Sequence, residues 1–199
     1  MAGATIVLLG ILVFLLLSDP NANSSRAPAT RFAGAVRPES PPVRFALQNQ
    51  DGELIRASAL RGQPAIVAFI YSTCQNDCPT IAQQIRGALD RIGSEIPAVA
   101  ISVDPAGDTA ASAQRFLSAQ RLGGRLQFLL GSEQKLQPVW REFGVQPQQK
   151  DREHSAAVVL LDAAGRQRIG FPLSELTPEA IAHDVLALQR EAASQSAAQ

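Results

Sequence analysis

The residues of this chain best suited to chemistry are its two cysteines, Cys74 and Cys78, which lie four positions apart. The apolar run at residues 65–71 precedes them and predicts a buried strand, because it is short and rich in Ile, Val and Phe. Pro79 follows, and apolar residues then recur at helical spacing. We therefore expect Cys74 in a loop and Cys78 at a helix N-terminus. The partial positive charge there favours thiolate over thiol, so the pair should act as nucleophiles or metal ligands.

Length and composition set the broad class of the protein. The chain has 199 residues, of which 46% are hydrophobic and 18% are charged, and this is typical of a single globular domain. Its 18 basic residues balance 18 acidic residues, so no cationic face for nucleic acid is expected. Nucleic acid is therefore excluded as a partner.

The first 42 residues differ in composition from the rest of the chain. Residues 2–17 are almost wholly apolar and uncharged, so we interpret residues 1–18 as a membrane anchor or, alternatively, a cleaved signal segment. Residues 19–42 are rich in Asn, Ser, Ala, Pro and Arg without periodicity, which predicts a flexible linker. A folded domain on the extracytoplasmic, periplasmic side of a membrane is expected, either tethered or released by cleavage.

The remainder of the chain alternates short apolar runs with segments of helical spacing. Asp51 and Gly52 lie between two extended runs and predict a hairpin. Strands are also expected at residues 96–104, 126–130, 154–162 and 166–171, and helices at 109–120 and from Ser132 and Thr177 onward. This order predicts an α/β protein with a thioredoxin-like fold, in which helices flank a central mixed sheet. The domain should span residues 43–190, with a polar tail at 191–199.

Three motifs in this order resemble those of one protein family. FIYSTCQNDCP, ISVDPAGDT and EHSAAVVLLDAAGR are similar to the Cys-x3-Cys-Pro, Ser-Val-Asp-Pro and late His-to-Gly segments of the Sco/SenC family of copper-binding thioredoxin-like proteins. The resemblance covers about residues 43–190. It implies that Cys74, Cys78 and His154 bind copper. It also implies a membrane-tethered or exported protein that serves assembly of the binuclear copper site of cytochrome c oxidase, with the copper-bearing subunit or another copper chaperone as partner.

The donor types agree with copper. Two thiolates suit Cu(I), and a neutral imidazole added to them makes a site that can also hold Cu(II). Structural zinc normally takes four protein ligands, whereas this chain has only two Cys and two His. The loop departs from the family pattern, since Gln75 and Asn76 stand where Pro and Asp are common and the acid appears one place later as Asp77.

The preferred function is therefore a copper metallochaperone rather than an enzyme, with Cu(I) or Cu(II) as its cargo. A membrane-tethered thiol:disulfide reductase, which would keep partner cysteines reduced for metal insertion, is the main alternative, and a redox sensor is a third. A plain structural disulfide would add little stability because the loop that it closes is short. His154 discriminates among these functions, because a metal site needs it and dithiol exchange does not.

Three other residues have less certain roles. Asp104 follows a predicted strand, at an edge where ligands gather in α/β sheets, although Asp before Pro is also an ordinary turn starter. His183 falls outside the apolar face of the last helix and is expected to be solvated. Trp140 is expected in the core.

Overall fold

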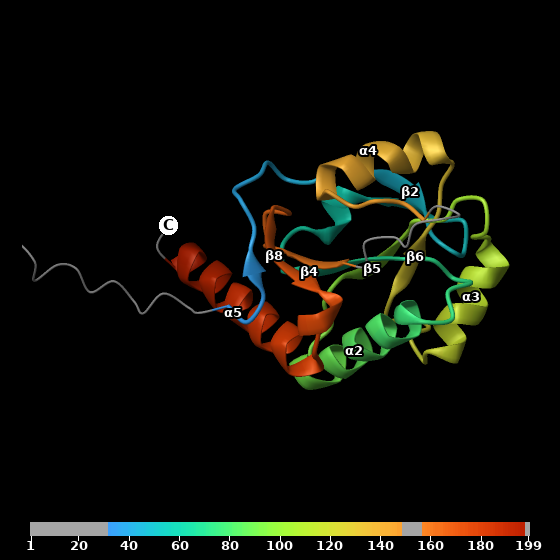
Figure 1. The fold of residues 1–199 in the computed structure, drawn as a ribbon. Helices are drawn as coiled ribbons and strands as arrows, with labels where there is room; N and C mark the ends of the chain where they lie inside the picture. Colours follow the sequence, from blue (N-terminus) through green and yellow to red (C-terminus); the bar gives the residue numbers. More distant parts are fainter. Residues whose placement is uncertain (1–31, 149–156, 198–199) are drawn as a thin grey trace, which may run out of the picture. The chain divides into compact units, whose positions relative to one another are not determined.

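Strand β4 (Ala65–Ile70) lies inside a six-stranded sheet, and all six of its residues are buried. The computed structural model describes residues 32–148 and 157–197. The strand order is β1-β8-β7-β4-β5-β6. Strands β4, β5 and β6 pair in parallel, whereas β7, β8 and β1 continue the other side of the sheet in antiparallel pairs (Figure 1). The bounds of the other five strands are β1 Ala35–Val36, β5 Ala98–Ser102, β6 Gln127–Leu129, β7 Ala157–Leu161 and β8 Gln167–Pro172.

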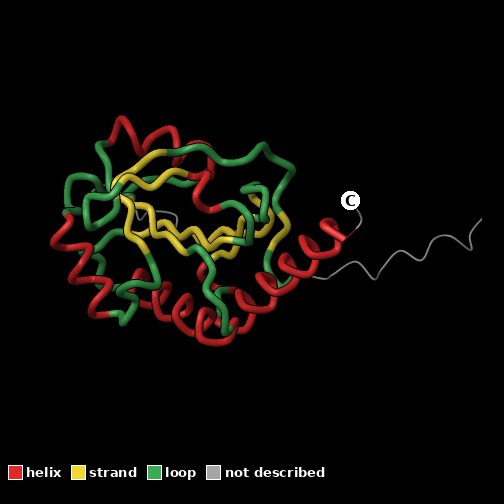
Figure 2. The backbone as a smooth tube through the Cα atoms, turned by 180° about the vertical axis from the view of Figure 1, so that it is seen from behind, coloured by secondary structure: helices red, strands yellow, loops and turns green. Residues whose placement is uncertain are grey.

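Helices cover both faces of this sheet, as the order of elements predicted. Helices α2 (Asp77–Ile92) and α5 (Pro178–Ala197) lie side by side on one face (Figure 1). Helix α4 (Glu133–Phe143) and the hairpin of β2 (Ala46–Gln48) and β3 (Leu54–Arg56) cover the other face, and Figure 2 shows both layers from behind. Helix α3 (Ala110–Ala119) lies near β6, and two short 3-10 turns, Ala57–Leu60 and Leu173–Glu175, complete the elements. The thioredoxin-like fold is thus confirmed.

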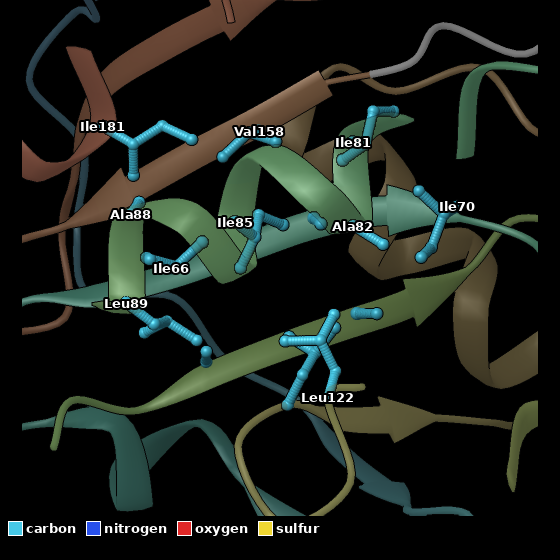
Figure 3. Packing of buried hydrophobic residues seen from close by; sticks show 14 of the residues in the cluster. Ile66, Ile70, Ile81, Ala82, Ile85, Ala88, Leu89, Leu122, Val158 and Ile181 are labelled. Carbon is cyan, nitrogen blue, oxygen red and sulfur yellow. The ribbon is translucent and has the colours of Figure 1, made fainter. Parts of the chain in front are cut away.

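Strand β4 contributes side chains to the hydrophobic clusters on both faces of the sheet. Ile66 and Ile70 point toward α2 and pack in one cluster with Ile85 (Figure 3). Phe69 points to the opposite face, where its ring centroid lies 4.9 Å from that of Phe143 in α4. Because both faces are buried, β4 has an unbroken apolar sequence rather than an alternating one.

Helix α3 ends where the sequence predicted, to within one residue. It stops at Ala119, against a predicted end at residue 120, and the glycine pair Gly123 and Gly124 lies further along the chain. Arg121 takes a left-handed conformation with φ 55°, and the Leu122 N–H donates to the Leu117 carbonyl at 2.8 Å. Leu122 is thereby turned into the core, where it is fully buried. Burial of this side chain therefore ends the helix before the glycines are reached.

The boundary predicted at residue 43 is too late, because residues 32–42 belong to the folded unit. Strand β1 pairs with β8, and the N–H groups of Ala33 and Gly34 donate to the Asp184 carboxylate at 2.8 and 2.9 Å. At its other end the domain also extends further, since α5 continues to Ala197 through most of the predicted polar tail, where alanines favour helix. Residues 1–31, which include the predicted anchor, lie outside the described residues. Within the described ranges, no helix is long and apolar enough to cross a membrane.

We predict that Asp184→Ala destabilises the domain by about 1–3 kcal/mol, because two backbone donors lose the acceptor that holds the N-terminal segment to α5. Thermal unfolding of the variant measures this loss. The matched control is Glu179→Ala, also in α5, which removes an exposed ion pair with Arg91 and should cost only about 0–1 kcal/mol. Equal melting temperatures for the two variants would contradict the role given to Asp184.

Candidate metal centre

Two thiols meet at the carboxyl end of β4. Cys74 lies in the loop after the strand, and Cys78 is the second residue of α2, as the sequence predicted. The Cys78 N–H donates to the Cys74 sulfur at 3.3 Å, and the Cys78 side chain is also hydrogen-bonded to Cys74. Both cysteines are free thiols in this structure. The loop and the first turn of α2 thus bring the two sulfur atoms together without a covalent bond.

The two thiols differ in accessibility. Cys74 is 9% exposed, whereas Cys78 is 0% exposed beneath it. A reagent, metal ion or partner sulfur arriving from solvent therefore reaches Cys74 first.

Burial changes the acidity expected for Cys78. Desolvation raises the pKa of the Cys78 thiol well above its usual value, the hydrogen bond to Cys74 and the charges of Cys74 and Asp77 add to this, and a backbone hydrogen bond from Tyr71 acts the other way. A helix N-terminus supplies only about 0.3–1 kcal/mol, less than one pKa unit, whereas full burial shifts a pKa by up to about 3–5 units. The predicted preference for thiolate is therefore wrong for Cys78 in the metal-free protein.

Tyr71 is a member of the site that the sequence analysis missed. It was counted as the last apolar residue of the strand, yet its hydroxyl is hydrogen-bonded to the Cys74 side chain. Burial raises the pKa of Tyr71 to about 12, and the hydrogen bond to Cys74 and the charges of Cys74, Cys78 and Asp104 act in the same direction. Near neutral pH the phenol is therefore a protonated donor to sulfur. Its position three residues before Cys74 is the signal that could have found it.

Asp104, a candidate for supporting the metal ligands, instead shapes its own turn. Its carboxylate accepts the Gly107 N–H at 3.1 Å, and its carbonyl accepts the Asp108 N–H at 2.9 Å. A Cβ atom at position 107 would collide with the Asp104 carboxylate, so a larger residue there would have to displace this side chain. The interpretation of Asp104 as a turn starter is confirmed, and it reaches the sulfur site only through its charge.

Asp108 is the acid that does contact the cysteine loop. One of its oxygens accepts the Ser72 N–H at 2.7 Å and the Ser72 hydroxyl at 2.5 Å, and the other accepts the Ser102 hydroxyl at 2.5 Å. Burial raises the pKa of Asp108, while these hydrogen bonds lower it. Asp108 is not the cap of α3, because Thr109 caps this helix with Ser112.

The two histidines are not both described. His154 lies outside the described residues, so its part in the site stays a prediction. His183 is half-exposed on α5, where its Nδ1 lies 2.7 Å from an Asp184 oxygen, so it is paired rather than simply solvated. Among residues 32–148 and 157–197, no three His, Cys, Asp or Glu groups gather to form a metal site. Of the predicted ligands, the described residues include the two thiols of Cys74 and Cys78. Two thiols suit a soft metal ion, whereas a harder ion needs further ligands.

A mixed thioredoxin-like sheet with a Cys-x3-Cys pair at the carboxyl end of its central strand defines a thioredoxin-like dithiol protein. The sequence matches the SCO1/SenC family over residues 37–190. The chain therefore belongs to the SCO1/SenC family.

Individual relatives agree with this assignment. A SCO2-like protein of Rickettsia conorii is 25% identical over 172 residues, covering 78% of this chain and 83% of that protein. The structure of Bradyrhizobium japonicum ScoI with copper bound is similar, with a TM-score of 0.64 and 29% identity over 75% of this chain and 99% of that chain. BsSco, described as having a disulfide switch and as a member of the Sco family of cytochrome c oxidase assembly proteins, matches with a TM-score of 0.64 and 22% identity over 76% of this chain and 95% of that chain.

The raised pKa of Tyr71 predicts an alkaline titration specific to the folded protein. Tyr71 is the single tyrosine of the chain, so the absorbance of tyrosinate reports on it alone. The folded protein should titrate toward pH 12, whereas the unfolded chain should titrate near pH 10. Because the folded state holds this proton more tightly, the associated stability is complete below about pH 10 and is lost as the pH rises toward the folded pKa.

The control for this titration is Cys74→Ala, which removes the hydrogen bond but leaves the burial. Its midpoint should fall between those of the folded and unfolded wild type, since burial is the largest cause of the shift. A folded wild type that titrates at the ordinary value would contradict the contact between Tyr71 and Cys74.

Proposed function

We propose that this protein is a copper metallochaperone that binds Cu(I) or Cu(II) through Cys74, Cys78 and His154. The observation that carries the proposal is the pair of free, hydrogen-bonded thiols in a chain of the SCO1/SenC family. Thiolate sulfur is the preferred donor for Cu(I), and two neighbouring thiolates can hold it without other ligands. The copper bound in Bradyrhizobium japonicum ScoI supports the choice of metal.

The strand register supports His154 as the third ligand. Ala157, at the start of β7, pairs with Phe69, which is the fifth residue of β4. A chain of three residues spans at most about 10 Å, so the His154 Cα lies within about that distance of the Ala157 Cα, which is itself next to the end of β4. The cysteine loop leaves β4 at the same end. An imidazole added to two thiolates would extend the site from Cu(I) to Cu(II).

The destination proposed for the copper is the binuclear copper site of cytochrome c oxidase, delivered to its copper-bearing subunit or through another copper chaperone. The description of BsSco as belonging to a family of oxidase assembly proteins supports this destination. The proposed location is the extracytoplasmic, periplasmic side of a membrane, with residues 1–18 as an anchor or a cleaved signal.

The unequal exposure of the two thiols favours one second candidate, a thiol:disulfide reductase. Cys74, the outer sulfur, would attack a partner disulfide as thiolate, forming a mixed disulfide and releasing one partner thiolate. Cys78 would then attack Cys74, releasing the second partner thiolate and leaving the Cys74–Cys78 disulfide. Each cycle would oxidise this dithiol and reduce one partner disulfide.

The copper proposal predicts that the reduced protein binds a single copper ion per chain, and that the Cys74→Ser, Cys78→Ser double variant binds none. Metal analysis after desalting measures the stoichiometry. Oxidised wild type is the matched control, because a Cys74–Cys78 disulfide offers no thiolate and should also hold none. Retention of a full equivalent by the double variant would overturn the site assignment.

The role proposed for His154 is tested against the only other histidine of the chain. His154→Ala should lose Cu(II) retention while keeping most Cu(I) binding, because two thiolates suffice for Cu(I). His183→Ala should match the wild type for both valences, since its ring pairs with Asp184. Oxidase assembly in cells is the second measurement. Normal assembly with His154→Ala, alongside failure with either cysteine variant, would favour thiol chemistry over copper delivery.

A further inference from the structure

The loop that carries Cys74 is hydrogen-bonded to the carboxylate of Asp108. Ser72 lies two residues before Cys74, and both its backbone N–H and its hydroxyl donate to Asp108, at 2.7 and 2.5 Å. The two donors of Ser72 converge on one oxygen, which fixes both the main chain and the side chain at this point. Asp108 itself lies 36 positions away in the sequence, in the segment between β5 and α3.

The other oxygen of Asp108 is bound to a rigid part of the core. It accepts the hydroxyl of Ser102, the fully buried last residue of β5. The Ser102 hydroxyl in turn accepts the Asp104 N–H at 3.2 Å, and the Ser102 carbonyl accepts the Trp140 indole N–H from α4 at 2.9 Å. A chain of hydrogen bonds therefore runs from the packed indole of Trp140 through Ser102 and Asp108 to Ser72.

Asp108 is free for this role because other groups cap α3. The Thr109 side chain accepts the Ser112 N–H at 3.1 Å, and the Ser112 hydroxyl accepts the Thr109 N–H at 2.9 Å. The Ser112 hydroxyl oxygen also lies 2.7 Å from that of Ser72, so the first turn of α3 supports the same serine. All three groups that face the Asp108 side chain are hydrogen-bond donors: the Ser72 N–H and the hydroxyls of Ser72 and Ser102. An ionised carboxylate only accepts hydrogen bonds, so it suits this position.

We propose that Asp108 is the positioning residue of the dithiol loop, which it holds in the arrangement that binds copper. This inference rests on the proposed function and adds a residue that touches neither copper nor sulfur. Asp108 fixes the main chain at Ser72, two residues before Cys74. The loop is thereby held in the conformation in which the Cys74 sulfur meets the first turn of α2, which carries Cys78. Supporting groups of this kind typically change metal affinity by about 10–100-fold when they are removed.

The test compares Asp108→Ala and Asp108→Asn with a matched control, Asp162→Asn. Asp162 is also a carboxylate that orders a turn, accepting the N–H groups of Ala164 and Arg166 at 2.9 Å, but it follows the end of β7 that pairs with the start of β4. Two quantities are measured on the full-length reduced proteins at a temperature where all are folded. The first is Cu(I) affinity in competition with a chelator, and the second is amide hydrogen exchange across residues 71–78.

Asp108→Ala should weaken Cu(I) binding by about 10–100-fold and speed exchange in residues 71–78. Asp108→Asn keeps one acceptor oxygen, so its Cu(I) affinity and its exchange rates should lie between those of Asp108→Ala and the wild type. Asp162→Asn should keep wild-type affinity and loop exchange. Wild-type affinity in both Asp108 variants would overturn the proposal, even if their melting temperatures fall. A wild type that binds no copper would instead refute the proposed function, and the exchange measurement would then decide alone whether Asp108 orders the loop.

If Asp108→Ala does not fold, Asp108→Asn decides the affinity comparison, with Ser72→Ala as its partner variant. Ser72→Ala removes the 2.5 Å hydroxyl bond but keeps the 2.7 Å backbone bond to Asp108, so its Cu(I) affinity should fall below that of the wild type without being abolished. Loss of affinity in Ser72→Ala with none in Asp108→Asn would show that the serine acts by another route and would overturn the role of Asp108.

Discussion

Burial of β4 on both faces is the constraint on which the rest of the structure depends. No residue of β4 is exposed, so the chain reaches the surface only beyond the ends of the strand. It turns at the carboxyl edge of the sheet, and α2 then covers one face. Parallel pairing brings the end of β5 to the same edge. The two loops that follow these strands therefore lie together, and ligand sites in α/β sheets gather at such edges for this reason. The thiol pair and Asp108 come from these two loops.

The two cysteines of the dithiol site are buried to different degrees, and burial affects how easily each sulfur can react. Burial keeps Cys78 protonated by raising its pKa, and it also screens the inner sulfur from solvent. Cys74 is the outer sulfur, and the Cys78 N–H and the Tyr71 hydroxyl are both directed at it. Donors of this kind stabilise negative charge on sulfur when a proton is displaced by a metal ion. The arrangement is thus suited to a metal that replaces protons rather than to a permanently ionised pair.

Local signals in the sequence predicted most of the fold and the positions of the two cysteines within it. The uniformly apolar β4, the hairpin at Asp51 and Gly52 and the start of α2 at the second cysteine all follow from short-range patterns. What the sequence could not supply are contacts between distant segments. The attachment of Ala33 and Gly34 to Asp184 spans about 150 positions, and the bond from Ser72 to Asp108 spans 36. No periodicity or spacing encodes such pairs. Tyr71 was missed for a different reason, because it continues the apolar run of β4 in the sequence and yet faces a sulfur.

X-ray absorption spectroscopy at the copper edge tests the central claim most directly, since it counts the atoms bound to the metal. The reduced full-length protein, loaded with a substoichiometric amount of Cu(I), should show two sulfur ligands, and the Cu(II) form should add nitrogen from imidazole. Both sulfur contributions should disappear together in the variant that lacks Cys74 and Cys78. A copper ion bound in the wild type without sulfur in its coordination shell would contradict the assignment of the dithiol loop as the copper site.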